Sequence, residues 1–77
     1  MQKVKIFTAL DCPNCDDLKQ YLKAKSIDFE EINLSEDKNA AALIVQKTGF
    51  SVVPQIQIDE QFIVGFDRRK IDEVLKN

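Results

Sequence analysis

The chain has two cysteines, Cys12 and Cys15, separated by only two residues, and they lie where a strand pattern gives way to a helix pattern. Residues 3–7 alternate polar and apolar side chains and end in β-forming residues, which predicts a strand. Pro13 suits the first position of a helix, where a backbone N–H has no helical acceptor, so we expect a helix over 13–25. Both sulfurs should therefore lie at the start of a helix that closely follows a strand.

The remaining segments also alternate between strand and helix patterns. They predict a strand at 28–33, a helix at 36–48 capped by Ser35 and ended at Gly49, strands at 55–58 and 61–64 joined by an Asp59–Glu60 turn, and a helix at 67–76. A helical connection makes the first two strands parallel, and a tight turn makes the last two antiparallel. The predicted fold class is α/β: a single βαβαββα domain over residues 1–77, with a four-stranded mixed sheet and three helices.

The composition excludes several kinds of partner. The net charge is −2 over 77 residues, and Lys and Arg form no block, so nucleic acid is not expected to bind. Apolar runs are only a few residues long, far below a membrane span, and no signal-peptide pattern follows Met1. We therefore expect a cytoplasmic monomer that is the complete gene product. In a reducing compartment, a Cys-x-x-Cys pair indicates redox chemistry or metal binding more often than a structural disulfide.

Histidine is absent, which removes His-based catalysis and His metal ligands together. Two cysteines without histidine do not complete a tetrahedral metal site, so only a dimer or added small thiols would complete one. No tightly bound metal or other cofactor is expected on this chain. The remaining alternatives for the pair are two small buried apolar side chains or a redox-active dithiol, and the strand–helix context favours the dithiol.

The helix start assigns different roles to the two thiols. Free N–H groups at a helix N-terminus stabilise a thiolate on Cys12, whereas Cys15 should point toward the helix body and be more buried. Cys12 is then the residue that attacks a substrate disulfide, and Cys15 is the one that resolves the mixed disulfide. Pro13 stiffens the loop and withholds one N–H from the thiolate.

Three carboxylates, Asp11, Asp16 and Asp17, crowd around the pair. Their charge opposes a thiolate on Cys12, which would make the dithiol a stronger reductant and would favour a basic or neutral partner surface. Asp16 and Asp17 have an equally good structural explanation, because acidic residues in the first turn complement the helix dipole.

The segments "CPNC", "VVP" and "VGFDRRK" together resemble the glutaredoxin family, which has the thioredoxin fold, and the resemblance covers essentially the whole chain. It implies a cis Val53–Pro54 bond facing Cys12, with the Val53 backbone free to pair with a bound peptide or tripeptide. The substrate-binding residues that it implies are Pro13, Val53, Pro54, Gly65, Phe66 and Asp67.

Several positions differ from glutathione-dependent members of that family. Ala9 stands where they usually carry lysine, Asn14 where they have tyrosine, and Phe66 where they have a second glycine. Arg68 and Arg69 replace an acidic pair; they would grip an acidic group or form a solvated face. Phe66 either joins Val52 and Val53 in an apolar patch beside Cys12 or packs in the core.

The "GF" preceding the last helix is similar to NrdH-type redoxins, which pass electrons from thioredoxin reductase to ribonucleotide reductase. "IVGFDRRKIDEVL" resembles small glutaredoxin-like proteins of anaerobic bacteria and archaea. We therefore expect a dithiol redoxin that reduces protein disulfides and is recharged by a thioredoxin-reductase-type system. The alternatives are a glutaredoxin that uses glutathione as reductant, and a metal or iron–sulfur carrier that bridges a dimer through Cys12.

Overall fold

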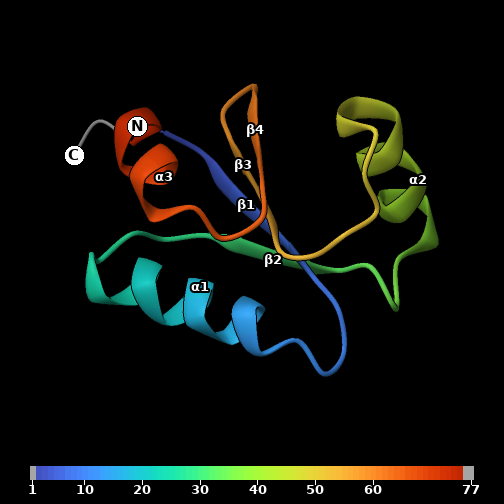
Figure 1. Ribbon diagram of the computed structural model, residues 1–77, viewed down its shortest axis with the longest axis horizontal. Coiled ribbons are helices and arrows are strands. Elements are labelled where there is room, and N and C mark those ends of the chain that lie inside the picture. Colours follow the sequence, from blue (N-terminus) through green and yellow to red (C-terminus); the bar gives the residue numbers. More distant parts are fainter. Residues whose placement is uncertain (1, 76–77) are drawn as a thin grey trace.

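The computed structural model describes residues 2–75 and has the predicted order of elements, drawn in Figure 1. These elements are β1 (Val4–Thr8), α1 (Pro13–Ala24), β2 (Glu30–Asn33), α2 (Lys38–Thr48), β3 (Gln55–Ile58), β4 (Gln61–Val64) and α3 (Arg68–Val74). No helix in this part of the chain is long and apolar enough to cross a membrane.

The four strands form one mixed sheet in the order β2-β1-β3-β4. β1 and β2 are parallel, whereas β1 pairs with β3, and β3 with β4, in antiparallel fashion. Ile6 lies opposite Ile56, and Ile56 lies opposite Ile63, so branched apolar side chains line up across three strands. The predicted mixed sheet, with its parallel first pair and antiparallel last pair, is confirmed.

The main core lies between the sheet and the two helices α1 and α3, which occupy the same side of the sheet in Figure 1. Its buried members come from β1, β3 and β4, from both helices and from the residue that follows α3: Val4, Ile6, Leu18, Leu22, Ile56, Ile58, Ile63, Ile71 and Leu75. Alternation along the strands puts these side chains on one face. Each fully buried Leu or Ile contributes about 1.5–3 kcal/mol of transfer free energy.

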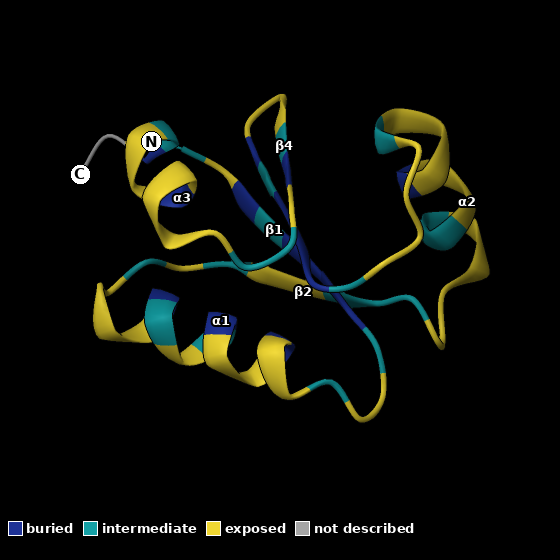
Figure 2. Cartoon of the chain, viewed as in Figure 1, coloured by how far each residue is buried: buried dark blue, intermediate teal, exposed yellow. Residues whose placement is uncertain are grey.

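The opposite side of the sheet is covered by α2, which buries fewer side chains against the sheet than α1 does. Ile44 is its one buried residue among those described, and Leu43 and Val45 stay exposed. Figure 2 shows the outer turns of α2 exposed while the strands at the centre are buried. On this face Phe7 and Phe62 stack with their ring centroids 6.5 Å apart.

The element boundaries correct five predictions. β1 covers Val4–Thr8, one residue further along the chain than the predicted strand at 3–7. α2 is capped by Asp37, which accepts from the Ala40 N–H at 2.9 Å, and not by Ser35. The Ser35 N–H instead donates to the Asn33 side chain inside a turn that delays the helix by two residues. β2 starts at Glu30, because its pairing with β1 begins there.

The other two corrections concern helix ends. α1 ends at Ala24, one residue early, and α3 covers 68–74 with Asp67 as its cap. Position 76, the predicted end of α3, lies outside the described residues. The prediction that Gly49 ends α2 is confirmed: it has φ +80°, a left-handed conformation that glycine adopts at little cost.

Candidate active site

Three loops meet at one edge of the sheet, where β1 and β4 end and β3 begins, and they carry the residues that the sequence singled out. β1 leaves the sheet at this edge toward Cys12. Because β3 runs antiparallel with Gln55 opposite Phe7, the chain enters β3 here through Pro54. β4 ends here as well, since Val64 lies opposite Gln55. The topology therefore brings together segments that are about 50 residues apart in the chain.

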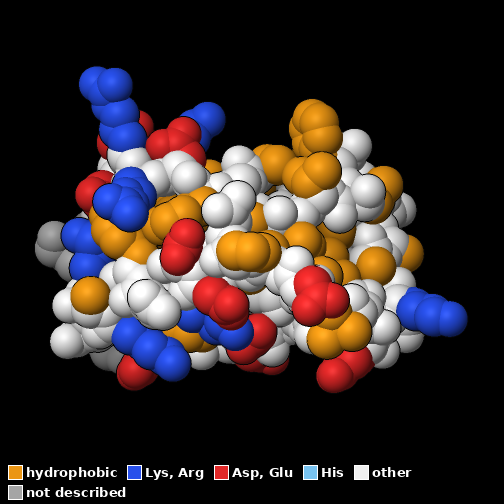
Figure 3. Space-filling view, turned by 60° about the horizontal axis from the view of Figure 1, so that its bottom comes forward, with side chains coloured by type: hydrophobic (Ala, Val, Ile, Leu, Met, Phe, Trp, Pro, Cys, Tyr) orange, Lys and Arg blue, Asp and Glu red, His pale blue; other side chains and the backbone are white. Residues whose placement is uncertain are grey.

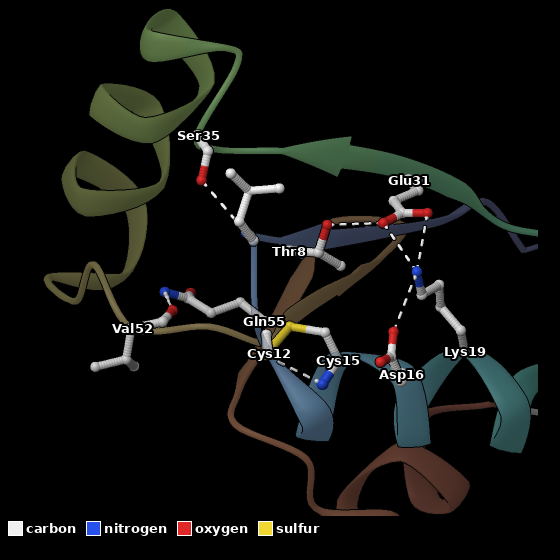
Figure 4. Close-up of a disulfide and its surroundings, with 10 residues drawn as sticks. Thr8, Cys12, Cys15, Asp16, Lys19, Glu31, Ser35, Val52 and Gln55 are labelled. Carbon is white, nitrogen blue, oxygen red and sulfur yellow. Dashed lines mark hydrogen bonds and ion pairs between the residues drawn. A yellow bond between two sulfur atoms is a disulfide. The ribbon is translucent and has the colours of Figure 1, made fainter.

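The two cysteines form a disulfide at the start of α1, with their Cα atoms 5.2 Å apart (Figure 4). Cys12 is the N-cap of the helix, and its Sγ accepts a hydrogen bond from the Cys15 backbone N–H at 3.1 Å. A sulfur in this position receives the N–H groups and the positive end of the helix dipole, which favour a thiolate.

The two sulfurs differ in access. Cys15 lies in the first turn of α1 and is 1% exposed, whereas Cys12 is only half-buried. Pro13, at the first helical position, is exposed. The geometry therefore presents one sulfur to an incoming molecule and keeps the other behind it.

Val53–Pro54 is a cis peptide bond, as the family resemblance implied. Pro54 is buried, and its carbonyl oxygen accepts from the Gly65 N–H at 2.8 Å. Val53 is half-buried, and neither its N–H nor its carbonyl oxygen has a hydrogen-bond partner within residues 2–75. A main-chain donor and acceptor are thus left available at the sheet edge that carries Cys12.

Phe66 is half-buried and packs against the core, the second of the two placements that the sequence left open. Its ring meets the Tyr21 ring edge-on at 5.7 Å, and it lies against the main core cluster. Asp67 is occupied as the cap of α3, accepting from the Lys70 N–H at 3.1 Å.

The two arginines have different surroundings. The Arg68 guanidinium lies over the Phe66 and Tyr21 rings, 5.4 and 5.6 Å from their centroids. Both arginines are exposed, and Arg69, which has no such ring contact in the described part of the chain, fits the expected solvated face. Cation–π contact, which the sequence analysis did not anticipate, therefore occupies Arg68.

The carboxylates around the pair are not equivalent. Asp16 lies 3.6 Å from Lys19, which neutralises part of its charge. Asp11 and Asp17 have no ion-pair partner in the described part of the chain. Asp11 also has φ +54°, a left-handed conformation that Asp tolerates better than most residues, so its presence has a backbone explanation too.

A polar network behind the cysteine loop was missed by the sequence analysis. The buried Thr8 hydroxyl donates to Glu31 at 2.8 Å, and Lys19 contacts the same carboxylate at 3.2 Å. The Thr8 hydrogen bond, followed by that from Lys19, holds the pKa of Glu31 below its usual value, and Glu31 in turn raises the pKa of Lys19. The network joins β1, β2 and α1 (Figure 4).

A second missed residue is Gln55, which is fully buried at the start of β3. Its amide nitrogen donates to the carbonyl oxygens of Phe50 and Val52, both at 2.9 Å. The alternation of Gln and Ile in "QIQI" is typical of a strand with one solvent-facing side, so no sequence signal marks this side chain as buried.

No cluster of three or more His, Cys, Asp or Glu side chains suited to a metal ion occurs within residues 2–75. The chemistry that the arrangement supports is that of the sulfurs themselves. A disulfide that closes and opens at the start of the first helix, in a sheet of this topology, defines the class of thiol–disulfide oxidoreductases.

The comparisons with known proteins supply the family. The Glutaredoxin family model matches residues 4–63, and the chain belongs to the glutaredoxin family. It is 37% identical over 73 residues to an uncharacterized glutaredoxin-like 8.6 kDa protein in the rubredoxin operon of Clostridium pasteurianum, covering 95% of this chain and 97% of that one. It is 34% identical over 67 residues to glutaredoxin 3 of Escherichia coli K12, covering 87% and 81%.

Among solved structures, NrdH-redoxin from Escherichia coli superposes with a TM-score of 0.83 at 25% identity, covering 97% of each chain. That protein is described as glutaredoxin-like with a thioredoxin-like activity profile. The predicted thioredoxin-like fold, the glutaredoxin resemblance and the activity of a thiol–disulfide oxidoreductase with a redox-active cysteine pair are all confirmed.

Proposed function

We propose that the chain is a cytoplasmic, monomeric dithiol redoxin that reduces disulfide bonds in proteins, with Cys12 as nucleophile and Cys15 as resolving residue. The observation that carries this assignment is the difference in burial: Cys15 is 1% exposed, whereas Cys12 is half-buried and caps the helix. An attacking sulfur has to be reached by its substrate, and a resolving sulfur has to reach only its neighbour.

The reaction has two exchange steps. The Cys12 thiolate attacks one sulfur of the substrate disulfide; that bond breaks, and the other substrate sulfur leaves as a thiolate that takes up a proton. The Cys15 thiolate then attacks Cys12 Sγ, forms the intramolecular disulfide and releases the second substrate thiol. The substrate gains two electrons and two protons, and the chain is left with the disulfide seen in the structure.

The substrate segment lies along the edge formed by Pro13, Val53 and Pro54. The unpaired N–H and carbonyl of Val53 pair with its backbone, as an added strand would. Gly65 supports this edge by donating to the Pro54 carbonyl. The two remaining residues implied by the family resemblance act indirectly, Phe66 by packing beneath the edge and Asp67 by capping α3.

For the reductant we favour a thioredoxin-reductase-type system over glutathione. Glutathione carries net negative charge, and the positions that hold it in glutathione-dependent members lack a suitable group here: Ala9 offers no cation, and Arg68 is committed to two aromatic rings. Asp11 and Asp17 add unpaired negative charge beside Cys12. The thioredoxin-like activity stated for the Escherichia coli neighbour points in the same direction.

The test supplies NADPH with thioredoxin reductase in one assay and with glutathione plus glutathione reductase in the other, and follows NADPH oxidation with the oxidised protein as substrate. We expect rapid oxidation only with thioredoxin reductase. Cys12→Ser should abolish reduction of a protein disulfide, and Cys15→Ser should stop at the mixed disulfide. Undiminished turnover by Cys12→Ser would refute the assignment, and glutathione-driven activity of Cys15→Ser would establish the glutathione-dependent alternative.

A further inference from the structure

Gln55 is a fully buried polar side chain that the exchange reaction does not use. It lies directly after the cis Pro54, at the start of an inner strand of the sheet. Its Nε2 donates to the carbonyl oxygens of Phe50 and Val52, so both amide hydrogens are engaged by one three-residue stretch. Figure 4 shows Gln55 directed toward Val52.

This stretch, Phe50–Val52, has little else to fix it. It belongs to no helix or strand, and its two large side chains are 55% and 53% exposed. Apart from the Gln55 amide, its hydrogen bonds join Phe50 to the Thr48 hydroxyl at 3.2–3.3 Å. Side chains that are half in solvent gain little from packing, so the Gln55 amide largely sets where Val52 and the following Val53 lie.

Stability alone does not explain a glutamine here. Its Oε1 is buried without a hydrogen-bond partner in the described part of the chain. A buried acceptor that is left unpaired is unfavourable for folding, and an apolar side chain of the same size would avoid that. The gain from glutamine is the fixed position of the Phe50–Val52 stretch.

The stretch also belongs to an apolar surface. The exposed large hydrophobic residues are Leu10, Leu43, Val45, Phe50, Val52 and Val64, and all but the last lie in the β1–α1 loop, in α2 or just after it. Figure 3 shows hydrophobic side chains gathered on the α2 half of the face that it presents. Contiguous exposed apolar surface of this kind indicates a protein contact.

We propose that Gln55 is a positioning residue that determines specificity for protein substrates. It holds Phe50 and Val52 where the polypeptide flanking a substrate disulfide contacts them, and it fixes the adjacent Val53 backbone that pairs with that polypeptide. This inference rests on the proposed function. A small disulfide reaches Cys12 without touching the stretch, whereas a protein disulfide does not. Gln55 therefore selects for protein disulfides with apolar side chains beside them.

The test replaces Gln55 with methionine, which has similar length and volume but no N–H donors. The matched control is Gln57→Met on the same strand, because Gln57 likewise donates to a backbone carbonyl, that of Asp59, at the far end of β3. Rate constants of the reduced proteins are measured with insulin as the protein disulfide and with bis(2-hydroxyethyl) disulfide as the small one. Gln55→Met should slow insulin reduction about tenfold and leave the small disulfide within about twofold, since misplaced contacts of this kind cost up to 10² in rate.

The control variant should change neither rate constant. Equal slowing of both substrates by Gln55→Met, or no slowing of insulin, would overturn the inference. If Gln55→Met does not fold, the surface double variant Phe50→Ser/Val52→Ser decides, because it should slow insulin selectively too, and an unchanged insulin rate would overturn the inference. Failure of the proposed function would give a different result, because the wild-type protein would then reduce neither insulin nor the small disulfide through Cys12.

Discussion

Replacing Thr8 with valine tests the polar network behind the cysteine loop. The two side chains have nearly the same shape, so the change mainly removes the hydroxyl that donates to Glu31 at 2.8 Å. That hydrogen bond is the main cause of the lowered pKa of Glu31, with the Lys19 contact next. The substitution thus separates one charge-assisted hydrogen bond from the packing of a residue that is 1% exposed.

The expected loss at pH 7 is about 1 kcal/mol of unfolding free energy. A hydrogen bond to a charged group contributes about 1.5–3 kcal/mol when well buried. The Glu31 side chain is 38% exposed, so water already solvates part of its charge, and the contribution falls below that range to about 1 kcal/mol. For a domain of this size, about 1 kcal/mol corresponds to a fall of about 4–8 °C in Tm.

The loss should depend on pH, with a defined sign. The pKa of Glu31 is lowered in the folded state, so its stabilising contribution is fully present above the unfolded value of 4.5. It disappears as the pH falls through the folded-state pKa and Glu31 takes up a proton. The difference between wild type and Thr8→Val should therefore be larger near pH 7 than near pH 3.

Urea unfolding at pH 7 and pH 3, followed by far-UV circular dichroism with the disulfide intact, measures this difference. Thr48→Val is the control, because the Thr48 hydroxyl donates to the Ile44 backbone carbonyl and not to a carboxylate, so its effect should not depend on pH. In a Glu31→Gln background, Thr8→Val should cost much less at pH 7. An equal loss from Thr8→Val at both pH values would refute the reasoning.

Three further predictions concern the helices. The pKa of Tyr21 is raised by its hydrogen bond to Asp72, so the phenolate absorbance should titrate above pH 10 and its midpoint should move to lower pH in Asp72→Asn. The chain has one tyrosine and no tryptophan, so the signal belongs to Tyr21 alone, and an unchanged midpoint in Asp72→Asn would contradict the prediction. Ile44→Ala should cost about 2–5 kcal/mol in urea unfolding, because Ile44 anchors α2. Gly49→Ala should cost about 1 kcal/mol despite open space around the added methyl, because φ is +80°; increased stability would rule this out.

The elements were predictable where a local signal fixed them. Pro13 marks the start of α1, Gly49 the end of α2, and the spacing of the "QIQIDEQFIV" segment gives the hairpin. The cap of α2 was predicted wrongly because Ser35 and Asp37 are both good capping residues. The choice between them depends on a hydrogen bond from the Ser35 N–H to Asn33, which propensity does not encode.

The site was predictable only in part, for a topological reason. The cysteine pair and the cis proline follow from short motifs. Gln55 did not stand out, because the alternation of Gln and Ile is typical of a strand with one solvent-facing side, and Thr8 lay just beyond the strand predicted at 3–7. β3 is an inner strand whose second face is covered as well, so the alternate side chain of Gln55 is buried instead of solvated.

The distribution of cations explains why this chain should discriminate against anionic substrates. Several cations near the site already have partners: Lys19 binds Glu31 and Asp16, and Arg68 lies over aromatic rings. Asp11, next to Cys12 in the chain, and Asp17 have no ion-pair partner within residues 2–75, so we expect a negative potential beside Cys12. The measured quantity is the ratio of the rate with a cationic disulfide, cystamine, to the rate with an anionic one, dithiodipropionate. This ratio should be higher for wild type than for Asp11→Asn/Asp17→Asn. Taking the ratio between proteins cancels the intrinsic reactivity of each disulfide. Added salt should reduce the wild-type preference toward that of the variant, since screening acts on the same charges.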